Sequence, residues 1–199
     1  MALNDLGLGV GAGHEAELRI DSTVVGLMQR TLSLEEKVGE LFELLRDPIY
    51  LYLVAVLGNP AEAQDLTQEV FLELYRVLHR GRVISNVRSW LFGVAHNLAF
   101  KRRENMQHCE GVDSRTWDEL RELLPDPGLN PEQRVLQMER FERLHAAMAW
   151  LSPQEVQCLH LRAEGFRYRE VGEILNINAK TAAEFLRRGI RKLMKDNNG

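Results

Sequence analysis

The sequence predicts an all-α protein in which an acidic linker joins two small helical domains. Apolar residues recur every three to four positions through most of the 199 residues, and no run alternates with the period of a strand. Prolines and acidic residues interrupt this pattern past the middle of the chain, and a basic helical segment follows. We therefore expect an extension over residues 1–20, a first domain over 21–104, a linker over 105–131 and a second domain over 132–199.

The extension and the start of the first domain differ in pattern. Residues 1–20 begin glycine-rich and show little periodicity, so we predict that they are poorly ordered. Asp21 or the serine after it is a suitable cap for a short helix. Ser33 followed by Glu36 is a capping box that predicts a second helix. Pro48 predicts the start of a third, because proline is favoured at a first helical position.

Two longer helices joined by a short polar turn are predicted within residues 65–103. Gly81 can end the first helix, and Ser85 or Asn86 can cap the second. The apolar residues at helical spacing are Leu66, Val70, Phe71, Leu74, Val77, Leu78, Val87, Trp90, Leu91, Val94, Ala95 and Leu98. The first helix then exposes an acidic and amide face, and the second exposes a polar face that ends in basic residues. An acidic face suits a basic protein partner, and a basic face suits nucleic acid.

The linker and the second domain differ in charge. Residues 104–131 hold seven acidic residues against Arg115 and Arg121, with prolines that break regular structure. Helical period returns over residues 131–150. A capping box at Ser152 and Glu155 then starts the next helix.

The end of the chain predicts a helix-turn-helix. A short helix over 168–175 leads into a turn at Asn176, and Asn178 can cap a longer helix that starts at residue 179. That last helix is strongly basic, although the whole chain carries a formal net charge of -4. Basic residues on such a helix neutralise DNA phosphates, and residues near its N-terminal end reach base edges. A core role for Phe185 and a solvated helix end at residues 191–195 are the competing interpretations.

Two ordered runs of residues resemble a known family. The run from Asp65 to Phe71 (DLTQEVF), followed by residues 87–99 (VRSWLFGVAHNLA), resembles region two of bacterial RNA polymerase sigma factors, above all the extracytoplasmic-function (ECF) group. Residues 168–175 resemble the first helix of sigma region four. The resemblance implies a region-two helical bundle, a region-four helix-turn-helix, and a role in transcription initiation.

The resemblance also implies which residues bind. Docking on the clamp coiled coil of core RNA polymerase is implied for Asp65, Gln68 and Glu69. Contact with the minus-ten promoter element is implied for Asn86, Arg88, Ser89, Trp90, His96, Asn97, Lys101, Arg102 and Arg103. Contact with the minus-thirty-five element is implied for Lys180, Thr181, Glu184, Phe185, Arg187, Arg188 and Arg191.

Several positions depart from the family pattern. Members commonly have basic or small polar residues where Ala183, Glu184 and Phe185 stand, so the minus-thirty-five sequence is not implied. Asn176 replaces the usual turn glycine. Phe71 and Trp90 also fit the apolar stripe, and we favour a core role for Phe71 and Trp90. The linker is interpreted as a solvated tether, with mimicry of nucleic-acid charge inside the polymerase as the alternative.

Nothing in the sequence indicates an enzyme, a metal site, a cofactor or a small-molecule substrate. Cys109 and Cys158 lie far apart, and no histidine pair has metal-ligand spacing. Residues 1–13 do not resemble a secretory signal, and no run approaches the ~20 apolar residues of a membrane span. We expect a cytoplasmic protein without membrane insertion.

The predicted function is that of a sigma factor, which binds core RNA polymerase at its clamp and flap and recognises and opens promoter DNA. The family often has an anti-sigma partner. The main alternative is a helix-turn-helix regulator that binds duplex DNA without polymerase. An interaction protein derived from a sigma factor, which has lost promoter reading, is a further alternative.

Overall fold

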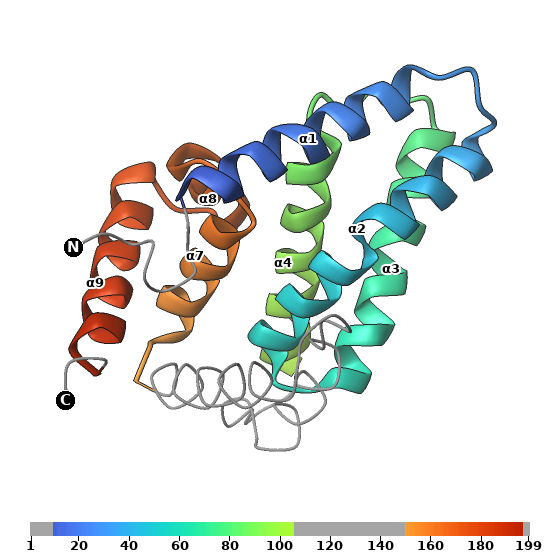
Figure 1. Ribbon diagram of the computed structural model, residues 1–199. Coiled ribbons are helices and arrows are strands. Elements are labelled where there is room, and N and C mark those ends of the chain that lie inside the picture. The colour runs from blue at the N-terminus through green and yellow to red at the C-terminus, as the bar shows by residue number, and fades with distance from the viewer. Residues whose placement is uncertain (1–9, 106–149, 197–199) are drawn as a thin grey trace, which may run out of the picture.

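The computed structural model describes residues 10–105 and 150–196, and this part of the chain is all-helical, as predicted (Figure 1). Its helices are α1 (Val10–Gln29), α2 (Leu34–Leu57), α3 (Pro60–His79), α4 (Val87–Asn105), α7 (Pro153–Ala163), α8 (Tyr168–Leu175) and α9 (Ala179–Asp196). We call α1–α4 the N-terminal half and α7–α9 the C-terminal half. None of the helices in these two ranges is long and apolar enough to span a bilayer.

Local sequence signals set most of the helix ends. The Ser33 hydroxyl accepts a hydrogen bond from the Glu36 amide, and the Glu36 carboxylate accepts one from the Ser33 amide, which completes the predicted capping box. Ser152 and Glu155 cap α7 in the same way. The α2 helix ends at Gly58, which has a left-handed backbone with φ 68°.

Two predicted helix starts are wrong. α1 begins at Val10, so residues 10–20 are helical where a poorly ordered extension is predicted, and Asp21 lies within the helix. Ile20, Val24 and Leu27 form a stripe at helical spacing that packs on the core, and this packing favours a helix that begins upstream of Asp21.

Pro48 does not start a helix, because it lies inside the single helix α2. A proline inside a helix removes one backbone hydrogen bond. The helix continues through it because Leu45, Ile49 and Tyr52, on either side of the proline, are completely buried.

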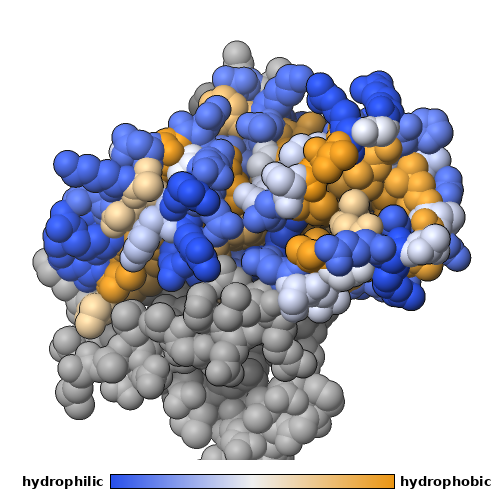
Figure 2. Space-filling model, turned by 90° about the horizontal axis from the view of Figure 1, so that it is seen from above, coloured by the Kyte–Doolittle hydropathy of each residue, from blue (hydrophilic) through white to orange (hydrophobic). Residues whose placement is uncertain are grey.

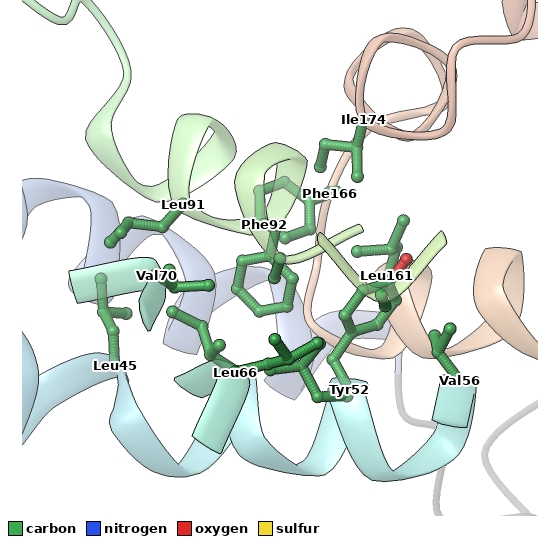
Figure 3. Close-up of a cluster of buried hydrophobic side chains, with 14 of the residues drawn as sticks. Leu45, Tyr52, Val56, Leu66, Val70, Leu91, Phe92, Leu161, Phe166 and Ile174 are labelled. Carbon is green, nitrogen blue, oxygen red and sulfur yellow. The ribbon is translucent and has the colours of Figure 1, made fainter. Parts of the chain in front are cut away.

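The two halves pack against each other. The α2, α3 and α4 helices lie side by side with α1 across one end, and α7–α9 form a second group of helices (Figure 1). The α8 helix contacts α4, and α7 contacts α2. Tyr52 of α2 and Phe92 of α4 meet Leu161 and Phe166 of the C-terminal half in one continuous apolar core (Figure 3).

Three predictions fall on residues that the structure does not describe. They are the first nine residues of the extension, the linker after Asn105, and the helix expected over residues 131–149. The domain boundaries at residues 104 and 132 therefore stay predictions.

Candidate nucleic-acid and polymerase interface

The outer face of α3 carries the residues predicted to bind a protein. Asp65 and Gln68 are exposed, and Glu69 is half-buried. The opposite face is buried, and Phe71 packs edge-on against Phe42 with ring centroids 4.9 Å apart, so the predicted core role of Phe71 is confirmed. The amphipathic pattern of α3 thus turns its acidic and amide side chains to solvent.

The first turn of α4 is fixed by its cap. The Asn86 side-chain oxygen accepts a hydrogen bond of 2.9 Å from the Ser89 amide, so Asn86 is the cap that sequence allowed. Ser89 and Trp90 are half-buried, and Trp90 packs against the core. That packing agrees with the core role favoured for Trp90.

Further along α4 the predicted residues are unequally accessible. Asn97 and Lys101 are exposed. His96 is half-buried, its Nδ1 lies 2.9 Å from the Tyr52 hydroxyl, and burial lowers its pKa below the ordinary value. The next two arginines have partners inside the N-terminal half, since Arg102 pairs with Glu62 and Arg103 reaches the Val56 carbonyl at 3.5 Å. Because of these partners, Asn97 and Lys101 are more accessible to a ligand than His96 and the two arginines.

Arg88 is not on the surface, although the α4 pattern predicts an exposed residue there. Only 1% of it is exposed, and its guanidinium lies 4.3 Å from the centroid of the Phe166 ring. One terminal nitrogen donates to the Glu164 carbonyl and lies 3.4 Å from the Glu164 carboxylate, and the other lies 3.5 Å from Asp21. Burial raises the pKa of Glu164, and the positive charge of Arg88 opposes that shift. The C-terminal half therefore covers this residue.

The α9 helix presents the predicted basic surface. Lys180, Arg187, Arg188 and Arg191 are exposed, and Thr181 is half-buried beside its cap, Asn178. Figure 2 shows hydrophilic residues over the side of the molecule where α9 lies. The helix-turn-helix geometry is also as predicted, because Asn176 adopts the left-handed conformation with φ 59°.

The structure shows the surroundings of two α9 residues, Glu184 and Phe185, that depart from the family pattern. Glu184 is half-buried and pairs with Arg187 and with Arg188, which reduces the local positive charge. Phe185 is half-buried and packs against the core, in agreement with the competing core interpretation. In the first turn of α9, Lys180 is exposed and Thr181 is half-buried.

Comparisons with known proteins agree with this geometry. The family model described as Sigma-70 region 2 matches residues 41–106, which include most of α2 and all of α3 and α4. The ECF RNA polymerase sigma factor SigW of Bacillus subtilis is 24% identical over 171 residues, covering 81% of this chain and 91% of its own. The ECF sigma factor BldN of Streptomyces coelicolor is 26% identical over 162 residues, covering 79% of this chain and 59% of its own.

The chain is an ECF sigma factor. It directs RNA polymerase to promoters and is a non-catalytic subunit of that enzyme. A solved structure of the sigma factor RpoE, in complex with the anti-sigma factor NepR from Bartonella quintana, shares the fold with a TM-score of 0.58. That structure is 15% identical and covers 80% of this chain and 96% of its own.

The sequence did not single out two exposed apolar side chains of this sigma factor. Leu72 on α3 is 54% exposed and stands one turn from Gln68 and Glu69. Phe100 on α4 is 58% exposed and adjoins Lys101. A signal was present for Leu72, because it lies off the buried stripe of α3. An exposed aromatic ring beside basic residues can stack on an unpaired base.

Lys192 joins two helices of the C-terminal half through its ammonium group. Its ammonium lies 2.7 Å from the Glu155 carboxylate, whose side chain is 4% exposed, and 3.1 Å from the Trp150 carbonyl. Burial alone would raise the pKa of Glu155, but hydrogen bonds from Lys192 and Ser152 hold that pKa below its ordinary value. The pair therefore links α7 to α9.

We expect Lys192→Met to lower the free energy of unfolding by about 1–2 kcal/mol at neutral pH, since solvent screens the half-exposed ammonium. A carboxyl whose folded pKa is lowered stabilises above its unfolded pKa and stops doing so as the pH falls through the folded value. Urea unfolding from pH 7 to pH 3 should show the deficit shrinking on acidification. Lys180→Met is the control, and equal deficits in both variants would contradict the prediction.

Proposed function

We propose that the N-terminal half docks on core RNA polymerase through Asp65, Gln68 and Glu69 and holds the minus-ten element with α4. The single observation that carries this proposal is the arrangement of one helical hairpin. The outer face of α3 is acidic and accessible, while the end of α4 carries Asn97 and Lys101 in accessible positions. The acidic face of α3 thus suits a basic protein surface, and the end of α4 suits a phosphate backbone.

The C-terminal half is proposed to read the minus-thirty-five element. Its α9 helix is presented at the surface with Lys180, Thr181, Arg187, Arg188 and Arg191 accessible or half-accessible. Phosphate contacts from the arginines would position the helix, and the first turn would reach base edges in the major groove. Linking two weak readers in one chain raises the effective concentration of the second once the first has bound.

The residues predicted to contact the minus-ten element differ in how accessible they are. Ser89, Trp90, His96, Arg102 and Arg103 are partly buried or paired. These five residues are proposed to support the minus-ten surface, with Asn97 and Lys101 as its most accessible contacts. Asn86 is exposed, whereas Arg88 is buried and would contact DNA only when the two halves separate. An anti-sigma partner is part of the proposal, by analogy with the RpoE–NepR structure. A cytoplasmic location is also proposed.

Transcription with a reconstituted holoenzyme tests the proposal. Core RNA polymerase with this chain should give discrete run-off transcripts on genomic fragments that core enzyme alone does not give. Mapping their start sites should reveal a shared pair of elements upstream. Association with core enzyme without any specific start would favour an interaction protein, and specific duplex binding without core association would favour a helix-turn-helix regulator.

A further inference from the structure

A hollow of about 650 Å³ lies between α1, α2 and the turn that joins them. The two helices leave this turn as the arms of a V (Figure 1). Leu27, Leu32 and Leu44 line the hollow, and Gly39 lies beside them. Leu27 is buried, whereas Leu32 and Leu44 are half-buried, so part of this apolar surface faces solvent. No lining residue belongs to the faces that we assign to polymerase or to promoter DNA.

The wall that α2 contributes to the hollow is acidic. Its carboxylates are those of Glu36, Glu40 and Glu43, and all three residues are exposed. Spacings of four and three residues place them on one face of α2, over about 10 Å of helix. Arg30 pairs with Glu40 at 2.7 Å, but Glu36 and Glu43 form no ion pair with another described residue. The hollow therefore combines apolar surface with uncompensated negative charge.

This combination of shape and charge favours one kind of occupant. Carboxylates repel the phosphates of nucleic acid and of anionic lipid. A small molecule would lie largely in solvent, because most of the lining residues are exposed, whereas small-molecule sites bury most of their ligand. The described ranges contain no strand, so an extended peptide has no sheet edge there to pair with. An amphipathic helix needs only a groove that receives its apolar face.

We propose that the hollow between α1 and α2 is a docking site for a basic amphipathic helix of a partner protein. The apolar stripe of that helix packs on the three leucines, and its lysine or arginine side chains pair with the three glutamates. A helix that lies along α2 has the same rise per residue, so cations spaced by three or four residues match the carboxylates in register. Room for close approach exists at Gly39, where a Cβ atom would meet nothing within 4 Å.

Binding of two designed peptides to the full-length chain tests the charge complementarity. Both peptides are stapled helices with the same leucine stripe, and one carries lysines beside the stripe where the other carries glutamates. Fluorescence anisotropy should show that the lysine peptide binds at least about tenfold more tightly at low salt, and added salt should reduce the difference. Equal affinities of the two peptides would overturn the proposal.

A pair of glycine substitutions tests where the lysine peptide binds. Gly39→Leu would put an isobutyl group into the hollow, and Gly26→Leu is the matched control on α1, because Gly26 does not line the hollow. A Cβ atom at either glycine would meet nothing within 4 Å, so both variants should fold. Gly39→Leu should weaken binding at least about tenfold, and Gly26→Leu should leave it unchanged. The same affinity in both variants would contradict docking in the hollow.

A second pair of substitutions separates the hollow from the acidic face of α3. Glu43→Gln and Asp65→Asn each remove one exposed carboxylate and preserve the size of the side chain. Because an exposed ion pair is weak, Glu43→Gln should reduce the affinity of the lysine peptide only about threefold, and Asp65→Asn should not change it. The reverse result would place the peptide on α3 and would refute the proposal.

Photo-cross-linking in the host cell tests whether a natural partner uses the hollow. A photoreactive amino acid at position 39 should cross-link to a protein segment with an apolar helical stripe flanked by lysine or arginine, as identified by mass spectrometry. The same amino acid at position 26 should not. A cross-link to an acidic segment, to nucleic acid or to a second copy of this chain would overturn the proposal, as would the absence of any cross-link specific to position 39.

Discussion

Replacing Gln68 and Glu69 with lysine is expected to reduce association with core RNA polymerase by at least about a hundredfold. The two substitutions change the charge of the α3 face by three units. Gln68 is exposed and Glu69 is half-buried, and neither side chain forms a hydrogen bond or ion pair with another described residue. Juxtaposed like charges at an interface cost several kcal/mol, so binding falls although folding is retained. Co-sedimentation or interferometry with core enzyme measures the loss.

The control for this experiment is Glu43→Lys, an exposed charge reversal on α2. It should bind core enzyme as the wild-type chain does. Circular dichroism should show that all three proteins have the same helix content. Undiminished binding by the Gln68→Lys and Glu69→Lys double variant would remove α3 as the docking face and would leave α4 and α9 as readers without a known attachment.

Gly172→Ala is expected to destabilise the C-terminal half by about 2–3 kcal/mol and to abolish minus-thirty-five recognition. A Cβ atom at this buried position would lie 2.6 Å from the Ile177 carbonyl oxygen and 3.2 Å from the Ala179 amide nitrogen. Both neighbours are backbone atoms, one in the turn before α9 and one in its first residue, so relief requires the backbone there to move. Urea unfolding and promoter-selective transcription measure the two effects.

A matched substitution separates this close approach from helix propensity. Gly39 lies inside α2, and a Cβ atom there would meet nothing within 4 Å. Gly39→Ala should therefore stabilise the protein by up to about 1 kcal/mol, because alanine favours a helix over glycine. Stabilisation by both substitutions would show that the turn in the helix-turn-helix is looser than the structure indicates.

Features that depend on nearby residues could be predicted from the sequence. The two capping boxes, the left-handed Asn176 and the cap at Asn178 each involve residues within three or four positions of one another. Spacing and chemistry define such motifs completely. The outward face of α3 and the basic face of α9 follow from helical period in the same way.

Features that depend on distant partners could not be predicted. Arg88 looks like a surface residue on its own helix, and its burial is caused by Glu164 and Phe166, more than seventy positions later. His96 meets Tyr52 at a separation of 44 residues. Pro48 is a local helix-start signal that long-range packing of α2 overrides. Periodicity shows that a face is buried or exposed in one helix but does not show what docks on it.

The continuous core also limits how this sigma factor can be recombined with its relatives. Phe92 packs edge-on against Phe166 of the other half, and Tyr52 and Leu161 belong to the same core. A chimaera that receives its C-terminal half from another member would set these four side chains against foreign neighbours. Modular exchange of promoter specificity should therefore succeed only when the graft is confined to the outward residues of α9, or when the donor brings matching core residues for both halves.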